Sequence, residues 1–207
     1  MKTGEGSSSI EVERKLRRGL ALEYLSVGWM TVEGAVAVYS GIVAGSIALV
    51  AFGGDSFVEL VSALAVAVYL RNRQSGNLDP SILHRTERVT AVLLFALIPV
   101  TGLSALFSYL TGTRAEGSLL GVIIAVAAVV MMPYLWMEKK SIGQETGCLP
   151  LTTDAVESAT CFFMSIALLG GLLSVTLFGL WWVDYLATAI ILAFIAREAI
   201  EAIGESR

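Results

Sequence analysis

The chain contains six apolar stretches, each long enough to cross a lipid bilayer as a helix. A transmembrane helix needs about 20 predominantly apolar residues. In this 207-residue chain 56% of the residues are hydrophobic and 15% are charged, against about 25% charged in an average soluble domain. The sequence therefore predicts an all-α membrane protein, a bundle of six transmembrane helices. We place them at about residues 20–44, 46–70, 86–110, 117–137, 153–175 and 179–201.

The six stretches leave no room for a second domain, because only short polar links separate them. We expect a polar N-terminal tail at residues 1–15, a six-span transmembrane domain at 16–202 and a short C-terminal tail at 203–207. The start of the chain is polar and rich in Gly and Ser, so it does not resemble a cleavable signal peptide.

The basic residues predict how the bundle is oriented, because short cytoplasmic loops carry an excess of Lys and Arg. With six spans, nearly all basic residues fall on one side of the membrane, and Arg114 alone falls on the other. We therefore expect both termini in the cytoplasm and the protein in the cell membrane. The clusters that decide this are Arg14 to Arg18, Arg71 and Arg73, Arg85 and Arg88, Lys139 and Lys140, and Arg197 with Arg207.

Two pairs of metal-capable side chains stand out inside the apolar stretches. Asp55 and Glu59 are four residues apart in the second stretch, and Glu157 and Cys161 are four apart in the fifth. Asp154 precedes Glu157 by three residues, so it falls on the same helical face. A carboxylate at membrane depth is costly unless it faces a partner, an ion or water. If the two stretches pack together, these residues form a candidate site for a divalent cation.

The donor types bear on which cation would bind. Zinc accepts carboxylates and sulfur in a tetrahedral site, whereas manganese, ferrous iron and magnesium prefer more ligands, mostly oxygen. Because Cys161 offers sulfur, we expect zinc, with manganese or iron as alternatives. A less specific alternative is that these polar residues only hydrogen-bond the helices together, and the presence of two spaced pairs weighs against it.

Other polar residues and glycines in the stretches carry weaker signals. For Glu33 and Asp184 we favour a structural role over a place in a permeation path. His84, the single histidine, falls in a cytoplasmic link, where contact with solvent or headgroups is expected rather than metal binding. Gly41 and Gly45 form a small-xxx-small pattern that permits close helix packing.

Three segments of the chain resemble the cation diffusion facilitators, also called cation efflux proteins. Residues 45–49 read G-S-I-A-L, similar to the G-S-x-A-L lead-in to two acidic ligands in that family's second span. Residues 151–161 resemble its L-x-x-D-A-x-H-x-x-x-D segment, and residues 184–199 resemble its sixth span. The resemblance covers about residues 15–202. It implies a six-helix transporter, commonly a homodimer, that exports divalent metal from the cytoplasm in exchange for protons.

The chain departs from the family pattern at several positions. Glu59 stands where the family usually has Asp, Glu157 where it has His or Asp, and Cys161 where it has Asp. The chain also stops shortly after the sixth stretch, so we expect no C-terminal cytoplasmic domain. A homodimer would then form through the membrane helices.

These observations lead to one hypothesis and several alternatives. Asp55, Glu59 and Glu157 bind the cation and carry the exchanged protons, Cys161 favours softer ions, and Asp154 acts as a ligand or as a neighbour of the ligands. The main alternative is a metal-binding or metal-sensing membrane protein that does not transport. A passive channel and a membrane-embedded hydrolase rank lower, and we expect no enzyme activity, no bound cofactor and no nucleic-acid partner, since the net charge is -4.

Overall fold

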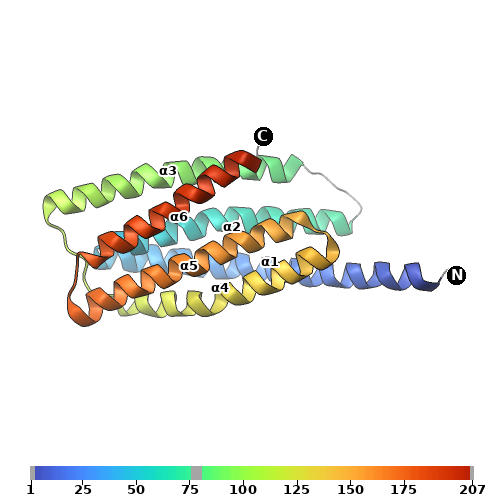
Figure 1. Cartoon of the computed structure of the whole chain (residues 1–207), viewed down its shortest axis with the longest axis horizontal. Coiled ribbons are helices and arrows are strands. Elements are labelled where there is room, and N and C mark those ends of the chain that lie inside the picture. The colour runs from blue at the N-terminus through green and yellow to red at the C-terminus, as the bar shows by residue number, and fades with distance from the viewer. Residues whose placement is uncertain (1–2, 76–80, 206–207) are drawn as a thin grey trace.

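The computed structural model describes residues 3–75 and 81–205, and these form six helices in an up-and-down bundle (Figure 1). The prediction of an all-α, six-helix protein is therefore confirmed. The helices are α1 (Thr3–Ala44), α2 (Ile47–Gln74), α3 (Ser81–Thr111), α4 (Leu119–Thr146), α5 (Leu149–Phe178) and α6 (Val183–Glu205).

Five of the helices are long and apolar enough to cross a membrane, namely the apolar parts of α1 to α5 within the described residues. The sixth predicted span, α6, is not among them, although it is part of the bundle. Its 23 residues begin near Asp184 and carry Arg197, Glu198 and Glu201 toward the other end. The helices also run beyond the predicted spans. A helix does not have to end where the hydrocarbon ends, and polar residues continue it into the interface.

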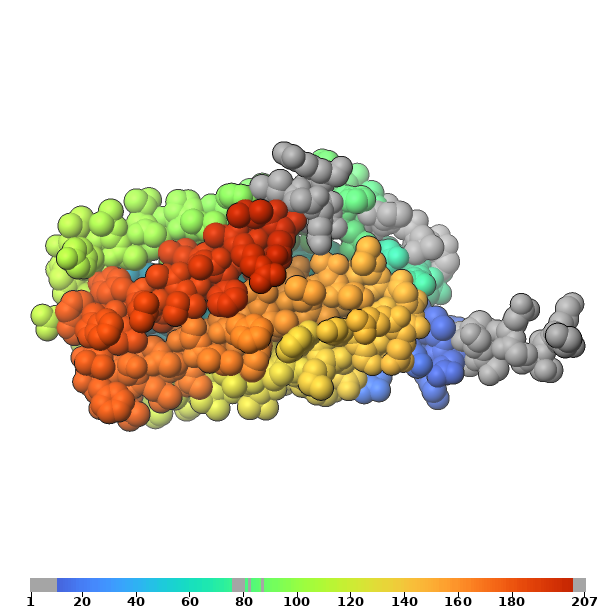
Figure 2. Space-filling model, in the orientation of Figure 1, coloured from blue at the N-terminus to red at the C-terminus, as the bar shows by residue number. Residues whose placement is uncertain are grey.

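The central position belongs to α2, which contacts α1, α3, α5 and α6. On one side, α1, α4 and α5 complete a ring with α2; on the other side, α3 and α6 contact each other and pack against it. The second and fifth predicted spans, now α2 and α5, therefore do pack together. Figure 2 shows α5 and α6 side by side over one face of the molecule, with α3 along its edge.

The start of α2 is tied to α6 by a buried carboxylate. Ser46 caps α2 by accepting a hydrogen bond from the backbone N–H of Leu49, and its hydroxyl donates to Asp184 Oδ1 at 2.5 Å. Asp184 Oδ2 accepts a further bond from the backbone N–H of Ile47 at 3.0 Å. Since the first N–H groups of a helix have no partner inside it, an acid here stabilises the helix start. Asp184 thus has the structural role expected for it.

Glycines bring α1 and α2 close enough for their backbones to touch. A Cβ added to Gly41 would lie 2.8 Å from the backbone nitrogen of Val50, and one added to Gly53 would lie 2.8 Å from that of Val38. Gly45, in contrast, has φ of +63° and forms the turn between the helices. Of the predicted Gly41 and Gly45 pair, only Gly41 is therefore at the helix contact.

Most of the interior of the bundle is apolar, and so is much of its outer surface. Fully buried side chains such as Leu49, Phe52, Leu135 and Leu168 fill the centre. Large apolar residues of α3, including Leu103 and others along the helix, are exposed on the outside. An outer surface of this kind is suited to hydrocarbon rather than to water, which agrees with a multi-pass integral membrane protein.

Candidate cation site

Two acids of α2 lie inside the bundle without hydrogen-bond partners. Asp55 is 0% exposed and Glu59 is 4% exposed, and they are one helical turn apart. None of their four carboxylate oxygens has a hydrogen-bond partner in the described part of the chain. An ionised carboxylate buried in this way is strongly unfavourable unless a counter-charge or a proton reaches it. This pair therefore needs a cation or protons.

A cavity of about 650 Å³ gives access to these acids. It lies between α2, α3, α5 and α6, and it extends from Asp55 to Tyr69, His84 and Pro150 near the helix ends. Those helix ends are on the same side of the bundle as the start of α1 and the end of α6. Its acidic wall residues are Asp55, Glu59, Asp154, Glu157, Glu198 and Glu201.

Asp154 takes part in a buried network of charges that links three helices. Its carboxylate pairs with the ammonium group of Lys139 from α4, which also lies 3.3 Å from Glu23 Oε2 of α1. The Lys139 side chain is 1% exposed and that of Glu23 is 0% exposed. The predicted site residue Asp154 does line the cavity, but part of its charge is balanced by Lys139.

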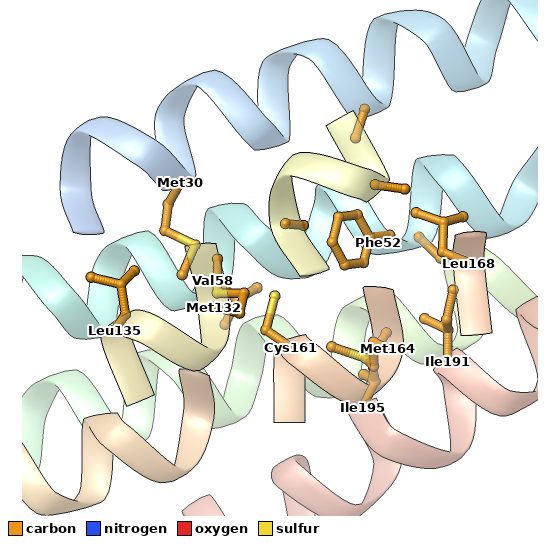
Figure 3. Close-up of a cluster of buried hydrophobic side chains, with 14 of the residues drawn as sticks. Met30, Phe52, Val58, Met132, Leu135, Cys161, Met164, Leu168, Ile191 and Ile195 are labelled. Carbon is orange, nitrogen blue, oxygen red and sulfur yellow. The ribbon is translucent and has the colours of Figure 1, made fainter. Parts of the chain in front are cut away.

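Cys161 lies away from the cavity wall, one turn beyond Glu157 on α5. It is 0% exposed and belongs to the apolar core. Figure 3 shows it beside Met132 of α4 and Val58 of α2. The structure thus brings Asp55, Glu59, Glu157 and Asp154 to one cavity and places the fifth predicted residue in an apolar cluster beside it. At that level α5 packs against α4, so the side chain meets methionine instead of open space.

Two further acids with buried carboxylate oxygens, Glu198 and Glu33, were not among the predicted site residues. Glu198 of α6 lines the cavity, and its place on the buried face with Asp184, Ile191 and Ile195 is a helical-spacing signal that could have identified it. Glu33 of α1 is 0% exposed, and its carboxylate oxygens make no hydrogen bond within residues 3–75 and 81–205.

The acids line a cavity and do not form a closed coordination sphere. Within the described ranges, no three His, Cys, Asp or Glu side chains lie close enough together to hold one metal ion. Glu59 is nevertheless within electrostatic range of Asp55, Glu157 and Glu198. Charges this close in a medium of low dielectric constant interact strongly, so a cation in the cavity would be attracted by several of them at once.

Apolar helices around a buried acidic cavity define the class of protein, a multi-pass integral membrane protein with a polar cavity inside its helical bundle. The chain belongs to the cation efflux family, because residues 24–207 match the cation efflux transmembrane domain. It is therefore a cation transporter by family and not an enzyme, as the sequence predicted. A comparison with curated proteins finds no significant match.

Proposed function

We propose that the protein exports a divalent metal cation from the cytoplasm in exchange for protons. Asp55, Glu59 and Glu157 hold the cation and afterwards take up the protons. The observation that carries the proposal is the pair of buried acids on α2: their four oxygens have no hydrogen-bond partner among the described residues, and both residues line the cavity.

Exchange follows from the chemistry of neighbouring carboxylates. Two ionised carboxylates one turn apart repel each other, and the apolar surroundings of the helix bundle leave this repulsion poorly screened. A divalent cation removes the repulsion, and so do protons. Metal and protons therefore compete for the same oxygens, which couples the departure of one to the arrival of the other.

The position of the cavity supports a conformation that takes up the cation from the cytoplasm. It extends to the end of the bundle near the two chain termini, which the distribution of basic residues assigns to the cytoplasm. A cation from the cytoplasm would reach Asp55 and Glu59 through this cavity. Transport then requires a second conformation in which the same acids open to the opposite side, as in alternating access.

Asp154 and Cys161 have secondary roles in this proposal. Asp154 lines the cavity and pairs with the buried Lys139 of α4, which limits the negative charge around the ligands. Cys161 would favour zinc if its sulfur turned into the cavity, but in the described conformation it packs beside Met132. The choice of metal therefore depends on the carboxylates more than the sequence suggested.

The proposal is tested by replacing Glu157 with Gln and measuring metal uptake into inverted membrane vesicles. Glu157→Gln keeps the shape of the side chain but removes its charge, so we expect uptake to be abolished. Glu145→Gln is the matched control, because Glu145 is on the surface and pairs with Lys15 at 2.8 Å. Full transport by Glu157→Gln would contradict the proposed role.

A further inference from the structure

Glu198 is an acid of the cavity that belongs to neither of the spaced pairs on α2 and α5. It comes from α6 and lines the same cavity as Asp55, Glu59 and Glu157. Its Oε1 atom is buried and has no hydrogen-bond partner in the part of the chain that the structure describes. It is also within electrostatic range of Asp55 and Glu157. These observations place a third helix at the candidate site.

The packing of α6 fixes where Glu198 lies. Ile191, Ile195 and Ala199 are 0% exposed, and α6 contacts both α2 and α5. Residues three, four and seven apart share a helical face, so Glu198, three residues after Ile195 and seven after Ile191, lies on the inward side of the helix. Its carboxylate is thereby held at the cavity by an apolar contact that does not depend on a bound ion.

We propose that Glu198 is an additional carboxylate ligand, direct or through water, and that the donor set of the site is therefore all oxygen, with no sulfur from Cys161. The inference rests on the proposed function, since it concerns the same site. Carboxylates of three helices would share the ion, some of them through water: Asp55 and Glu59 from α2, Glu157 from α5 and Glu198 from α6. Such a donor set suits hard divalent cations such as manganese, whereas a sulfur ligand favours softer metals.

The surroundings of the acids agree with this donor set. Cys161, the candidate sulfur ligand, is in the apolar cluster with Met132, whereas all four carboxylates are on the cavity wall. A cavity of about 650 Å³ has space for water beside the ion. Hard cations such as Mg²⁺ give up their water reluctantly and are commonly bound through a few carboxylates and several water molecules.

The first test is manganese binding to the purified full chain in detergent, followed by the electron paramagnetic resonance signal of free Mn²⁺, with zinc as competitor. We expect Mn²⁺ to bind, and Glu198→Gln to weaken the binding of both Mn²⁺ and Zn²⁺ by about tenfold or more. The control Glu13→Gln removes the same charge from an exposed residue of α1 that pairs with Arg17 at 2.8 Å and does not line the cavity, and it should have a much smaller effect. Equal effects of the two variants, or no binding of Mn²⁺ to the wild type, would overturn the inference.

A second test needs no variant of Glu198 and so holds even if that variant fails to fold. Cobalt bound by a thiolate shows a strong ligand-to-metal charge-transfer absorption in the near ultraviolet, whereas cobalt bound by oxygen does not. We expect the wild-type protein with Co²⁺ to lack this absorption and Cys161→Ser to bind Mn²⁺ as the wild type does. A thiolate band that disappears in Cys161→Ser would overturn the inference.

The proposed cation site and the role of Glu198 in it can be tested separately. If Asp55→Asn abolishes metal binding while Glu198→Gln has no effect, the proposed site stands and the role of Glu198 is wrong. If Asp55→Asn binds metal as the wild type does, the proposed site itself is wrong, and the inference about Glu198 is overturned with it.

Discussion

At the scale of single residues, Lys139 is a buried charge held by acids of two other helices. Its ammonium group lies between Glu23 and Asp154, and all three side chains are buried. A buried ion pair is often no more stable than an apolar substitute, but removing one partner leaves an uncompensated charge. Here a single lysine balances carboxylates from two other helices.

We therefore predict that Lys139→Met lowers the free energy of unfolding by about 3 to 5 kcal/mol, the usual cost of breaking a buried ion pair. Thermal unfolding in detergent, followed by circular dichroism, measures the effect. Lys140→Met is the control, since Lys140 is exposed and its ammonium group lies over the Trp136 ring, 5.8 Å from the ring centre. Equal melting temperatures for the two variants would show that the network does not stabilise the fold.

Some residues of the candidate site could be predicted from the sequence, and others could not. Asp55, Glu59, Glu157 and Asp154 were predicted, together with Cys161, from their helical spacing and from the cost of placing a carboxylate within the membrane. The pairing of Lys139 with Glu23 could not be predicted, since the two are 116 positions apart and Lys139 also fits an ordinary cytoplasmic helix end. The position of Cys161 in the apolar core could not be predicted either, because it depends on how Met132 of a third helix packs.

At the scale of elements, the contact between α1 and α2 depends on glycine. The backbones approach where Gly41 faces Val50 and Gly53 faces Val38. Small residues at such contacts allow close packing in membranes, where van der Waals contact replaces the hydrophobic effect as the main attraction between helices. The hydropathy of the sequence predicted both helices, but it could not show which glycine lies at the contact and which forms the turn.

Gly41→Ala should separate the two helices and cost about 1 to 3 kcal/mol of stability, because the new Cβ overpacks the contact. It would lie 2.7 Å from Val50 Cγ2 and 2.8 Å from the Val50 backbone nitrogen, and the backbone cannot move aside easily. Gly28→Ala, on the same helix, meets nothing within 4 Å and should leave the melting temperature unchanged or slightly higher. A Gly41→Ala protein that melts like Gly28→Ala would refute the close contact.

At the scale of the whole molecule, the bundle joins a central helix carrying buried acids to a cavity that extends to one end. The sequence predicted the number of helices, and its candidate site depended on the packing of α2 against α5, which the structure shows. Helical spacing could have marked Glu198 as an inward residue of α6, but its place at the cavity depends on how α6 crosses α2 and α5 in three dimensions. The side of the membrane that the cavity faces and a homodimer through the membrane helices stay predictions.

The central claim is that the buried acids bind a divalent cation and exchange it for protons. It is tested most directly in proteoliposomes that contain only this protein and a trapped pH-sensitive dye. Adding manganese or zinc outside should drive metal inward and protons outward, so the internal pH should rise with the wild-type protein and stay constant with Asp55→Asn. Metal binding by the wild type without any movement of metal or protons would contradict the account and indicate a metal-binding or metal-sensing protein instead.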